Sequence, residues 1–144
     1  MLANKIATNY ADFFAKINVN TSLESYREIF DPKVIFEDPF QKVEGIETLY
    51  AIFQDMYQTL YQPSFKIIEV LSQDTVAYIR WELHYQRKEA GKNEMIDGVS
   101  RVLFGEDNKV LEHKDFWDAA DSVYAKIPIL GWFIKALRKR IAHA

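Results

Sequence analysis

The chain has 144 residues, which fits one domain, and its 49% hydrophobic and 15% aromatic residues are enough for a folded core, so disorder is excluded. It contains no cysteine, which excludes disulfides, thiolate chemistry and cysteine-based zinc sites. The net charge of -3 argues against a general nucleic-acid-binding protein. No run of about 18 apolar residues and no signal-peptide pattern occurs, so we expect a cytoplasmic protein without a membrane span.

Two helices are predicted before the first strand. Residues 5–17 place apolar side chains on one helical face. Thr21, followed three residues later by Glu24, resembles a capping box that opens a second, short helix. Asp31-Pro32 is expected to end that helix, because the residue before a proline avoids the helical region.

A short strand and a third helix follow. Residues 34–38 are strand-like, and Pro39 stops the strand. Residues 47–61 carry apolar side chains at i, i+3, i+4 and i+7, which predicts an amphipathic helix that Gln62-Pro63 closes.

The second half of the chain predicts a sheet followed by a helical extension. Four segments rich in Val, Ile, Tyr and Phe are separated by short turn signals, which favours an antiparallel meander of residues 64–71, 75–87, 94–104 and 109–117. Residues 119–144 form an amphipathic C-terminal extension, in which Pro128 fits the first position of a helix. We therefore predict a single α+β domain over residues 1–144, with helices covering one face of a bent sheet and leaving a conical cavity.

Four motifs carry a resemblance to a known family: Phe30-Asp31-Pro32, Glu37-Asp38-Pro39, Gly45-Ile46 and the last strand up to Trp117. With the element order, they make residues 5–118 similar to the nuclear transport factor 2-like superfamily, in its SnoaL-like and ketosteroid isomerase-like branches. The resemblance implies a cone-shaped fold, a small-molecule pocket that needs no cofactor, and a homodimer formed through the exposed sheet face. The superfamily holds isomerases, dehydratases, cyclases, hydrolases and binding modules, so function is argued from the site.

Asp38 is the first candidate catalytic residue. The resemblance implies that the Asp of Glu-Asp-Pro is the base that moves a proton between carbons, and burial in an apolar pocket raises a carboxyl pKa toward that role. The alternative is a turn residue that caps its own backbone before Pro39. The two oxyanion donors of ketosteroid isomerase, a Tyr and a protonated Asp, are absent. Their matched positions hold Phe13 or Phe14 and Ser100, and Tyr10 is a possible substitute donor.

His113 and Asp115 form the second candidate constellation. Their i, i+2 spacing places them on one strand face, where with Asp38 they could act as a proton partner and its orienter. A pair that only satisfies buried polarity and a metal site with Asp38 are the alternatives, and we expect no metal.

The remaining pocket residues follow from strand alternation. Trp81 and Trp117 are expected to give flat apolar walls or ordinary core packing. The full set of predicted substrate-binding residues is Tyr10, Phe14, Trp81, Leu83, Tyr85, Ser100, Val102 and Trp117. The outward face of the same strands suits solvent or a partner's sheet.

The C-terminal extension could cover the cavity, pack in a dimer or contact a membrane surface, and we favour packing. The sequence thus predicts a cofactor-independent isomerase or lyase that moves protons on a small, apolar carbonyl compound. The alternative is a non-catalytic ligand-binding or protein-interaction module of the same fold.

Overall fold

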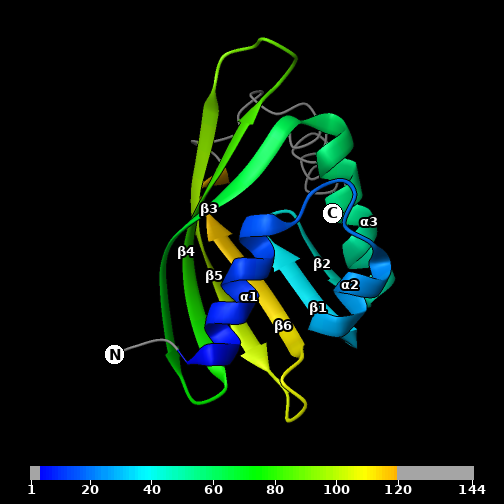
Figure 1. Cartoon of the computed structure of the whole chain (residues 1–144), viewed down its shortest axis with the longest axis vertical. Coiled ribbons are helices and arrows are strands. Elements are labelled where there is room, and N and C mark those ends of the chain that lie inside the picture. Colours follow the sequence, from blue (N-terminus) through cyan, green and yellow to red (C-terminus); the bar gives the residue numbers. More distant parts are fainter. Residues whose placement is uncertain (1–3, 120–144) are drawn as a thin grey trace, which may run out of the picture.

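The computed structural model describes residues 4–119. The predicted C-terminal helices and their proposed lid, dimer and membrane contacts fall in residues 120–144, outside the described part. Within the described range the elements, in chain order, are α1 Lys5–Lys16, α2 Leu23–Ile29, β1 Phe30–Asp38, β2 Gln41–Glu44, α3 Ile46–Thr59, β3 Tyr61–Gln73, β4 Val76–Gln86, β5 Glu94–Phe104 and β6 Val110–Trp117 (Figure 1).

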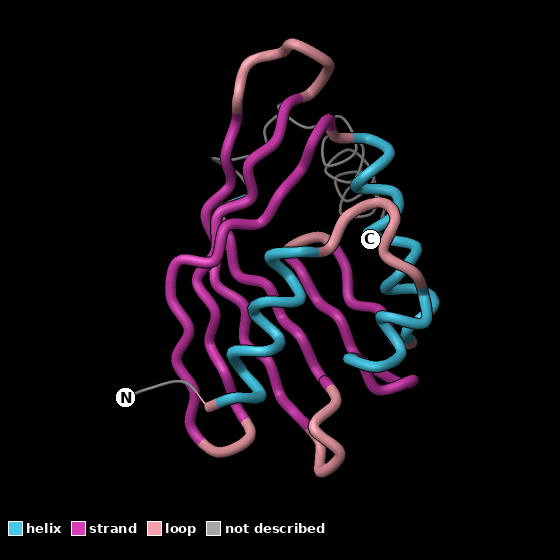
Figure 2. The backbone as a smooth tube through the Cα atoms, in the orientation of Figure 1, coloured by secondary structure: helices cyan, strands magenta, loops and turns pink. Residues whose placement is uncertain are grey.

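The strands form one curved, open sheet in the order β2-β1-β6-β5-β4-β3 (Figures 1 and 2). The predicted antiparallel meander is confirmed for β3 to β6. β1 extends this sheet by pairing with β6 in parallel, so the sheet is mixed rather than antiparallel throughout. β2, which the sequence analysis did not predict, pairs with β1 as a short hairpin. The fold is α+β of the nuclear transport factor 2-like type, as predicted.

α2 ends at Ile29 and α3 at Thr59, so both helices end before the prolines, as predicted, and each proline lies inside the strand that follows. Pro32 is in β1, in a stretch where the β1–β6 register shifts between Phe30 and Ile35. Pro63 is in the edge strand β3, where the β3–β4 register shifts between Tyr61 and Ser64. A proline has no N–H to donate to a ladder, so it is tolerated at edges and irregular pairings.

The cap of α2 also differs from the prediction by one residue. Ser22, not Thr21, is the N-cap, and its Oγ accepts a hydrogen bond from the Ser25 N–H. The Thr21 hydroxyl instead accepts from the Asn18 N–H and closes the preceding turn. Both residue types cap helices well, so sequence preference alone does not separate them.

The helices bury their apolar faces against the concave side of the sheet (Figure 1). α1 packs on β3, while α3 packs on β1, β2 and β3. The inward residues of β4 and β5 are buried at alternate positions, as strand alternation predicted. Among the described residues, no helix is both long and apolar enough to cross a bilayer.

Candidate functional site

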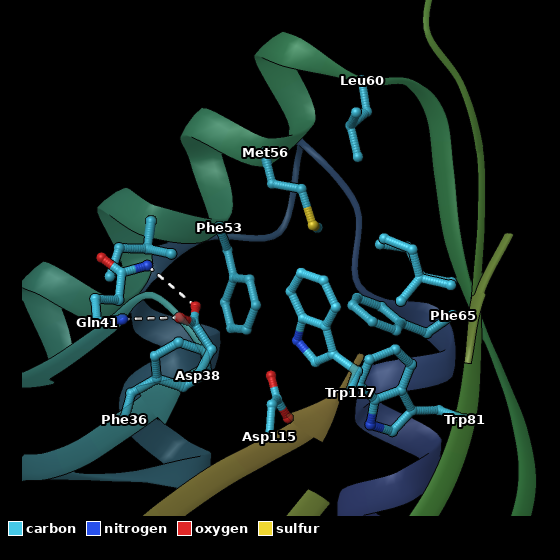
Figure 3. A pocket seen from close by; sticks show the side chains of 13 residues that line it. Phe36, Asp38, Gln41, Phe53, Met56, Leu60, Phe65, Trp81, Asp115 and Trp117 are labelled. Carbon is cyan, nitrogen blue, oxygen red and sulfur yellow. Dashed lines mark hydrogen bonds between the residues drawn. The ribbon is translucent and has the colours of Figure 1, made fainter. Parts of the chain in front are cut away.

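A cavity of ≈ 100 Å³ opens between α3 and the concave face of the sheet (Figure 3). Its polar lining consists of Asp38, Gln41 and Asp115, and none of the described lining residues is Lys or Arg. The rest of the lining is apolar: Phe36, Ile52, Phe53, Met56, Leu60, Phe65, Trp81, Leu83, Ile96 and Trp117. The site therefore presents two carboxyl groups and one amide to an otherwise apolar space.

A second cavity of ≈ 20 Å³ lies next to the first. Its walls include Phe14, Ser100 and His113. The two cavities share four lining residues, which are Phe53, Phe65, Trp81 and Asp115. Asp115 and Trp81 therefore border both cavities.

Asp38 ends β1 and is both a turn residue and a cavity residue. Its Oδ1 accepts hydrogen bonds from the backbone N–H groups of Phe40, at 2.8 Å, and Gln41, at 3.0 Å. Its Oδ2 accepts from the Gln41 side-chain amide at 3.1 Å (Figure 3). The two interpretations left open by the sequence are thus compatible, because one carboxyl group caps the turn and also faces the cavity.

Burial raises the pKa of Asp38 above its ordinary value. The hydrogen bonds from Gln41 and Phe40 work in the opposite direction, and the nearby Asp115 charge adds to the rise. The net upward shift favours the protonated, hydrogen-bond-donating form of Asp38 more than in a solvated carboxyl group.

Asp115 projects from β6 into the cavity and is held through one oxygen (Figure 3). Its Oδ1 accepts from the Ser100 hydroxyl at 2.5 Å and lies 2.7 Å from Nε2 of His113. Within residues 4–119, no group donates a hydrogen bond to Oδ2 of Asp115. Among the described residues, one carboxylate oxygen is therefore held by two contacts, while the other has no hydrogen-bond donor.

His113 is a buried link in this network, with 3% of its surface exposed. Its Nδ1 lies 2.7 Å from the Tyr10 hydroxyl. Burial raises the pKa of Tyr10, which keeps that hydroxyl protonated and able to donate to Nδ1. The assignment that gives every donor an acceptor then places the imidazole proton on Nε2, from which it is donated to Asp115.

The predicted site residues fall into three places. Asp38, Trp81, Leu83, Asp115 and Trp117 line the larger cavity. Phe14, Ser100 and His113 line the smaller one, together with Trp81 and Asp115. Three predicted residues are not in the lining of either cavity, which are Tyr10, Tyr85 and Val102.

These three residues occupy different positions outside the two cavities. Tyr10 lies behind His113 and is engaged by it, so its hydroxyl is not presented to the cavity. Tyr85 borders a surface depression with Gln62 and His84. Val102 is fully buried on the inner face and pairs in register with His113.

Several lining residues were missed by the sequence analysis. Gln41 follows the Glu-Asp-Pro motif and contributes the amide that holds Asp38. Ile52, Phe53 and Met56 come from α3, whose apolar periodicity was recognised only as a helix signal. That periodicity was sufficient to suggest a second wall for the cavity.

The metal alternative is not supported by the arrangement of side chains. In the part of the chain that the structure describes, no three His, Asp or Glu side chains are grouped so that they could hold a metal ion.

Fold and cavity together define an α+β protein with a small, acidic pocket, and sequence comparison names its family. The SnoaL-like domain family matches residues 9–113, and the chain belongs to it. A search among curated proteins finds no match.

Solved structures agree with the family assignment at the level of fold. A proposed SnoaL-like polyketide cyclase from Jannaschia sp. has a TM-score of 0.73 at 16% identity, covering 88% of this chain and 96% of its own. TsrD from Streptomyces laurentii has a TM-score of 0.71 at 13% identity, with 88% and 97% covered. A protein with a ketosteroid isomerase-like fold from Catenulispora acidiphila, in complex with trimethylamine, has a TM-score of 0.70 at 12% identity, with 88% and 95% covered. At these identities the likeness shows the fold alone.

Proposed function

We propose that this protein is a cofactor-independent isomerase or lyase that transfers protons on a small, largely apolar carbonyl compound. The observation that carries the proposal is that Asp38 and Asp115 face one apolar cavity and interact electrostatically within it. Two carboxyl groups in different environments can divide acid and base roles between them. His113 completes the set as a residue that positions Asp115.

The geometry favours Asp115 as the base and Asp38 as the acid. The resemblance suggested Asp38 as the base, with His113 and Asp115 as proton partner and orienter. Both oxygens of Asp38, however, accept hydrogen bonds from the turn. Oδ2 of Asp115 has no such partner among the described residues. The raised pKa of Asp38 suits a group that donates a proton or a hydrogen bond to a carbonyl oxygen.

The proposed reaction passes through an enol. Oδ2 of Asp115 takes a proton from the carbon beside the carbonyl, the C–H electron pair forms a C=C bond, and Asp38 protonates the carbonyl oxygen to give an enol. Re-formation of the carbonyl returns the oxygen's proton to Asp38. In a substrate with a C=C bond conjugated to the enol, transfer of the Asp115 proton to the far end of the diene as the carbonyl re-forms completes an isomerisation. In a substrate with a leaving group on the next carbon, re-formation of the carbonyl shifts the C=C bond and breaks the bond to that group, which takes the Asp115 proton and completes an elimination.

The cavity favours a substrate much smaller than a steroid. Pockets for drug-sized ligands are typically about 300–1,000 Å³, and an engineered cavity of about 150 Å³ holds benzene. The present cavity is ≈ 100 Å³. The donors of ketosteroid isomerase are also missing, because Phe14 cannot donate and the Ser100 hydroxyl already donates to Asp115.

Exchange of carbon-bound protons tests the proposal without knowledge of the natural substrate. The protein is incubated in heavy water with a panel of small ketones, and loss of the proton signal beside the carbonyl is followed by NMR. Wild-type protein should accelerate exchange, Asp115→Asn should abolish the acceleration, and Asp38→Asn should reduce it. Asp97→Asn, which changes an exposed carboxylate paired with Arg80, is the matched control.

Equal exchange rates for wild type and Asp115→Asn would contradict the catalytic proposal. Ketone binding without exchange would favour the second candidate, a non-catalytic ligand-binding module. The complex of the Catenulispora neighbour with trimethylamine supports that candidate, because it shows a protein of similar fold in complex with a small organic molecule.

The homodimer predicted from the resemblance stays part of the proposal. Tyr78, Met95 and Phe116 lie on the convex side of β4, β5 and β6 and are about half exposed, at 47%, 49% and 49%. Light scattering should give a dimer mass for the wild type and a monomer mass for a Phe116→Glu variant.

A further inference from the structure

Gly98 lies between two tryptophans on the concave face of the sheet. It pairs in register with Trp81 on β4 and with Trp117 on β6. Both tryptophans line the larger cavity, whereas Gly98 contributes no side chain to it. A glycine in the middle of a strand weakens the strand, so its presence here calls for a packing reason.

That reason is the position of the Trp81 ring. A Cβ atom added to Gly98 would lie 2.5 Å from Cη2 and 2.5 Å from Cζ2 of Trp81, much closer than real contacts allow. The φ angle of Gly98 is outside the left-handed region, so its backbone accepts any residue. The requirement for glycine therefore comes from the indole that lies against it, and not from the chain conformation.

The same placement connects Trp81 to the carboxylate of the site. The Trp81 Nε1–H donates to the Ser100 Oγ at 2.8 Å, and Ser100 is the next inward residue of β5. The Ser100 hydroxyl then donates to Asp115 at 2.5 Å. If the indole moved away from β5, Ser100 would lose one of the contacts that orient its hydroxyl toward Asp115.

The indole also forms a wall of both cavities. Because β5 lies directly behind it, a ring displaced by a side chain at position 98 has to move into the cavities in front. With only ≈ 100 Å³ in the larger cavity, such a movement removes a large share of the space for a ligand.

We propose that Gly98 is a specificity-determining residue, which lets Trp81 lie flat against β5 and thereby admits a four-carbon ketone to the cavity. A side chain at position 98 would restrict the cavity to still smaller carbonyl compounds. The inference rests on the proposed function for its ligand class. It adds that the upper size limit is set by the contact between Gly98 and Trp81.

The test compares two ketones that differ by one methylene group, 2-butanone and acetone. Their dissociation constants are measured by NMR titration with wild type, Gly98→Ala and the double variant Gly98→Ala/Trp81→Phe. In Gly98→Ala, 2-butanone should bind at least about tenfold more weakly while acetone changes little, since one methylene group in a tight pocket has effects of this size. The smaller Phe ring of the double variant should restore 2-butanone binding.

The Trp81 indole N–H resonance gives a second readout that does not depend on any ligand. It should shift in Gly98→Ala toward its position in Ser100→Ala, where the hydrogen bond has no acceptor. Unchanged 2-butanone binding or an unmoved indole resonance in Gly98→Ala would overturn the role of Gly98 alone. Failure of either ketone to bind the wild type would overturn the proposed ligand class and the size limit with it.

Discussion

Asp38 and Asp115 end up side by side because the two strands that carry them run parallel. Phe36 pairs with His113, and Glu37 pairs with Lys114, so each carboxyl group lies one residue beyond the last pair of this register. The parallel register thus brings together two acidic groups that are distant in sequence. Both groups therefore line the same cavity.

The pH dependence of stability should reveal the burial of Asp38. Its pKa is raised in the folded protein, so the folded state binds this proton more tightly than the unfolded chain does. The contribution of Asp38 to stability is therefore lost as pH rises from the ordinary carboxyl range, about pH 4, through the raised value. As pH rises through this range, the free energy of unfolding of Asp38→Asn should increase relative to that of the wild type, as measured by urea unfolding at a series of pH values.

Asn at position 38 keeps an oxygen that can accept from the Phe40 and Gln41 N–H groups, so the turn should survive. A stability difference between the two proteins that stays constant with pH would show that Asp38 titrates as a solvated group.

Removal of the Tyr10 hydroxyl should destabilise the fold, whereas removal of the Tyr26 hydroxyl should not. Both tyrosines are buried, at 2% and 0% exposure. The Tyr10 hydroxyl bonds His113, while the Tyr26 hydroxyl has no hydrogen-bond partner among residues 4–119. Tyr10→Phe should cost about 1–3 kcal/mol by leaving a buried ring nitrogen unpaired. Tyr26→Phe should be close to neutral, and equal costs for the two variants would contradict the assignment.

The His113 ring should also report the loss of Tyr10. With the Tyr10 hydroxyl donating to Nδ1, nitrogen NMR should find the imidazole proton on Nε2 in the wild type. In Tyr10→Phe, the population of the Nε2–H tautomer of His113 should fall and that of the Nδ1–H tautomer should rise. A proton found on Nδ1 in the wild type would contradict the assignment of Tyr10 as donor to Nδ1 and of Nε2 as donor to Asp115.

Ser100→Ala should weaken both stability and the orientation of Asp115. The substitution leaves the Trp81 indole N–H without its acceptor and removes a donor to Asp115, and we expect a loss of about 1–3 kcal/mol in urea unfolding. Ser64→Ala on β3 is the control, because Ser64 is exposed. If Ser100→Ala lowers the free energy of unfolding no more than Ser64→Ala does, the hydrogen bonds of the Ser100 hydroxyl to Trp81 and Asp115 do not stabilise the fold.

Strand alternation predicted much of the site from sequence. Trp81, Leu83 and Asp115 line the larger cavity because inward and outward residues alternate along β4 and β6. Tyr85 and Val102 lie on the same inward face and yet outside both cavities, since these strands are longer than the cavity they border. Alternation identifies a face but not the part of that face that is hollow.

Long-range pairing was harder to predict. The parallel contact between β1 and β6, and the four-residue strand β2, depend on the register of distant segments and leave no local pattern. The resemblance of the Glu-Asp-Pro motif suggested Asp38 as the base. Without the β1–β6 register, its hydrogen bonding could not be compared with that of Asp115. The contact between Gly98 and Trp81 likewise appears only when β4 and β5 are placed in register.

The most direct test of the central claim is a titration of the Asp38 carboxyl carbon by NMR in wild type and in Asp115→Asn, with Asp97→Asn as the control. If Asp38 and Asp115 share one desolvated cavity, the Asp38 pKa should lie above the ordinary carboxyl range in wild type and fall in Asp115→Asn, because a neighbouring negative charge is removed. An Asp38 pKa in the ordinary range that is the same in all three proteins would contradict the claim.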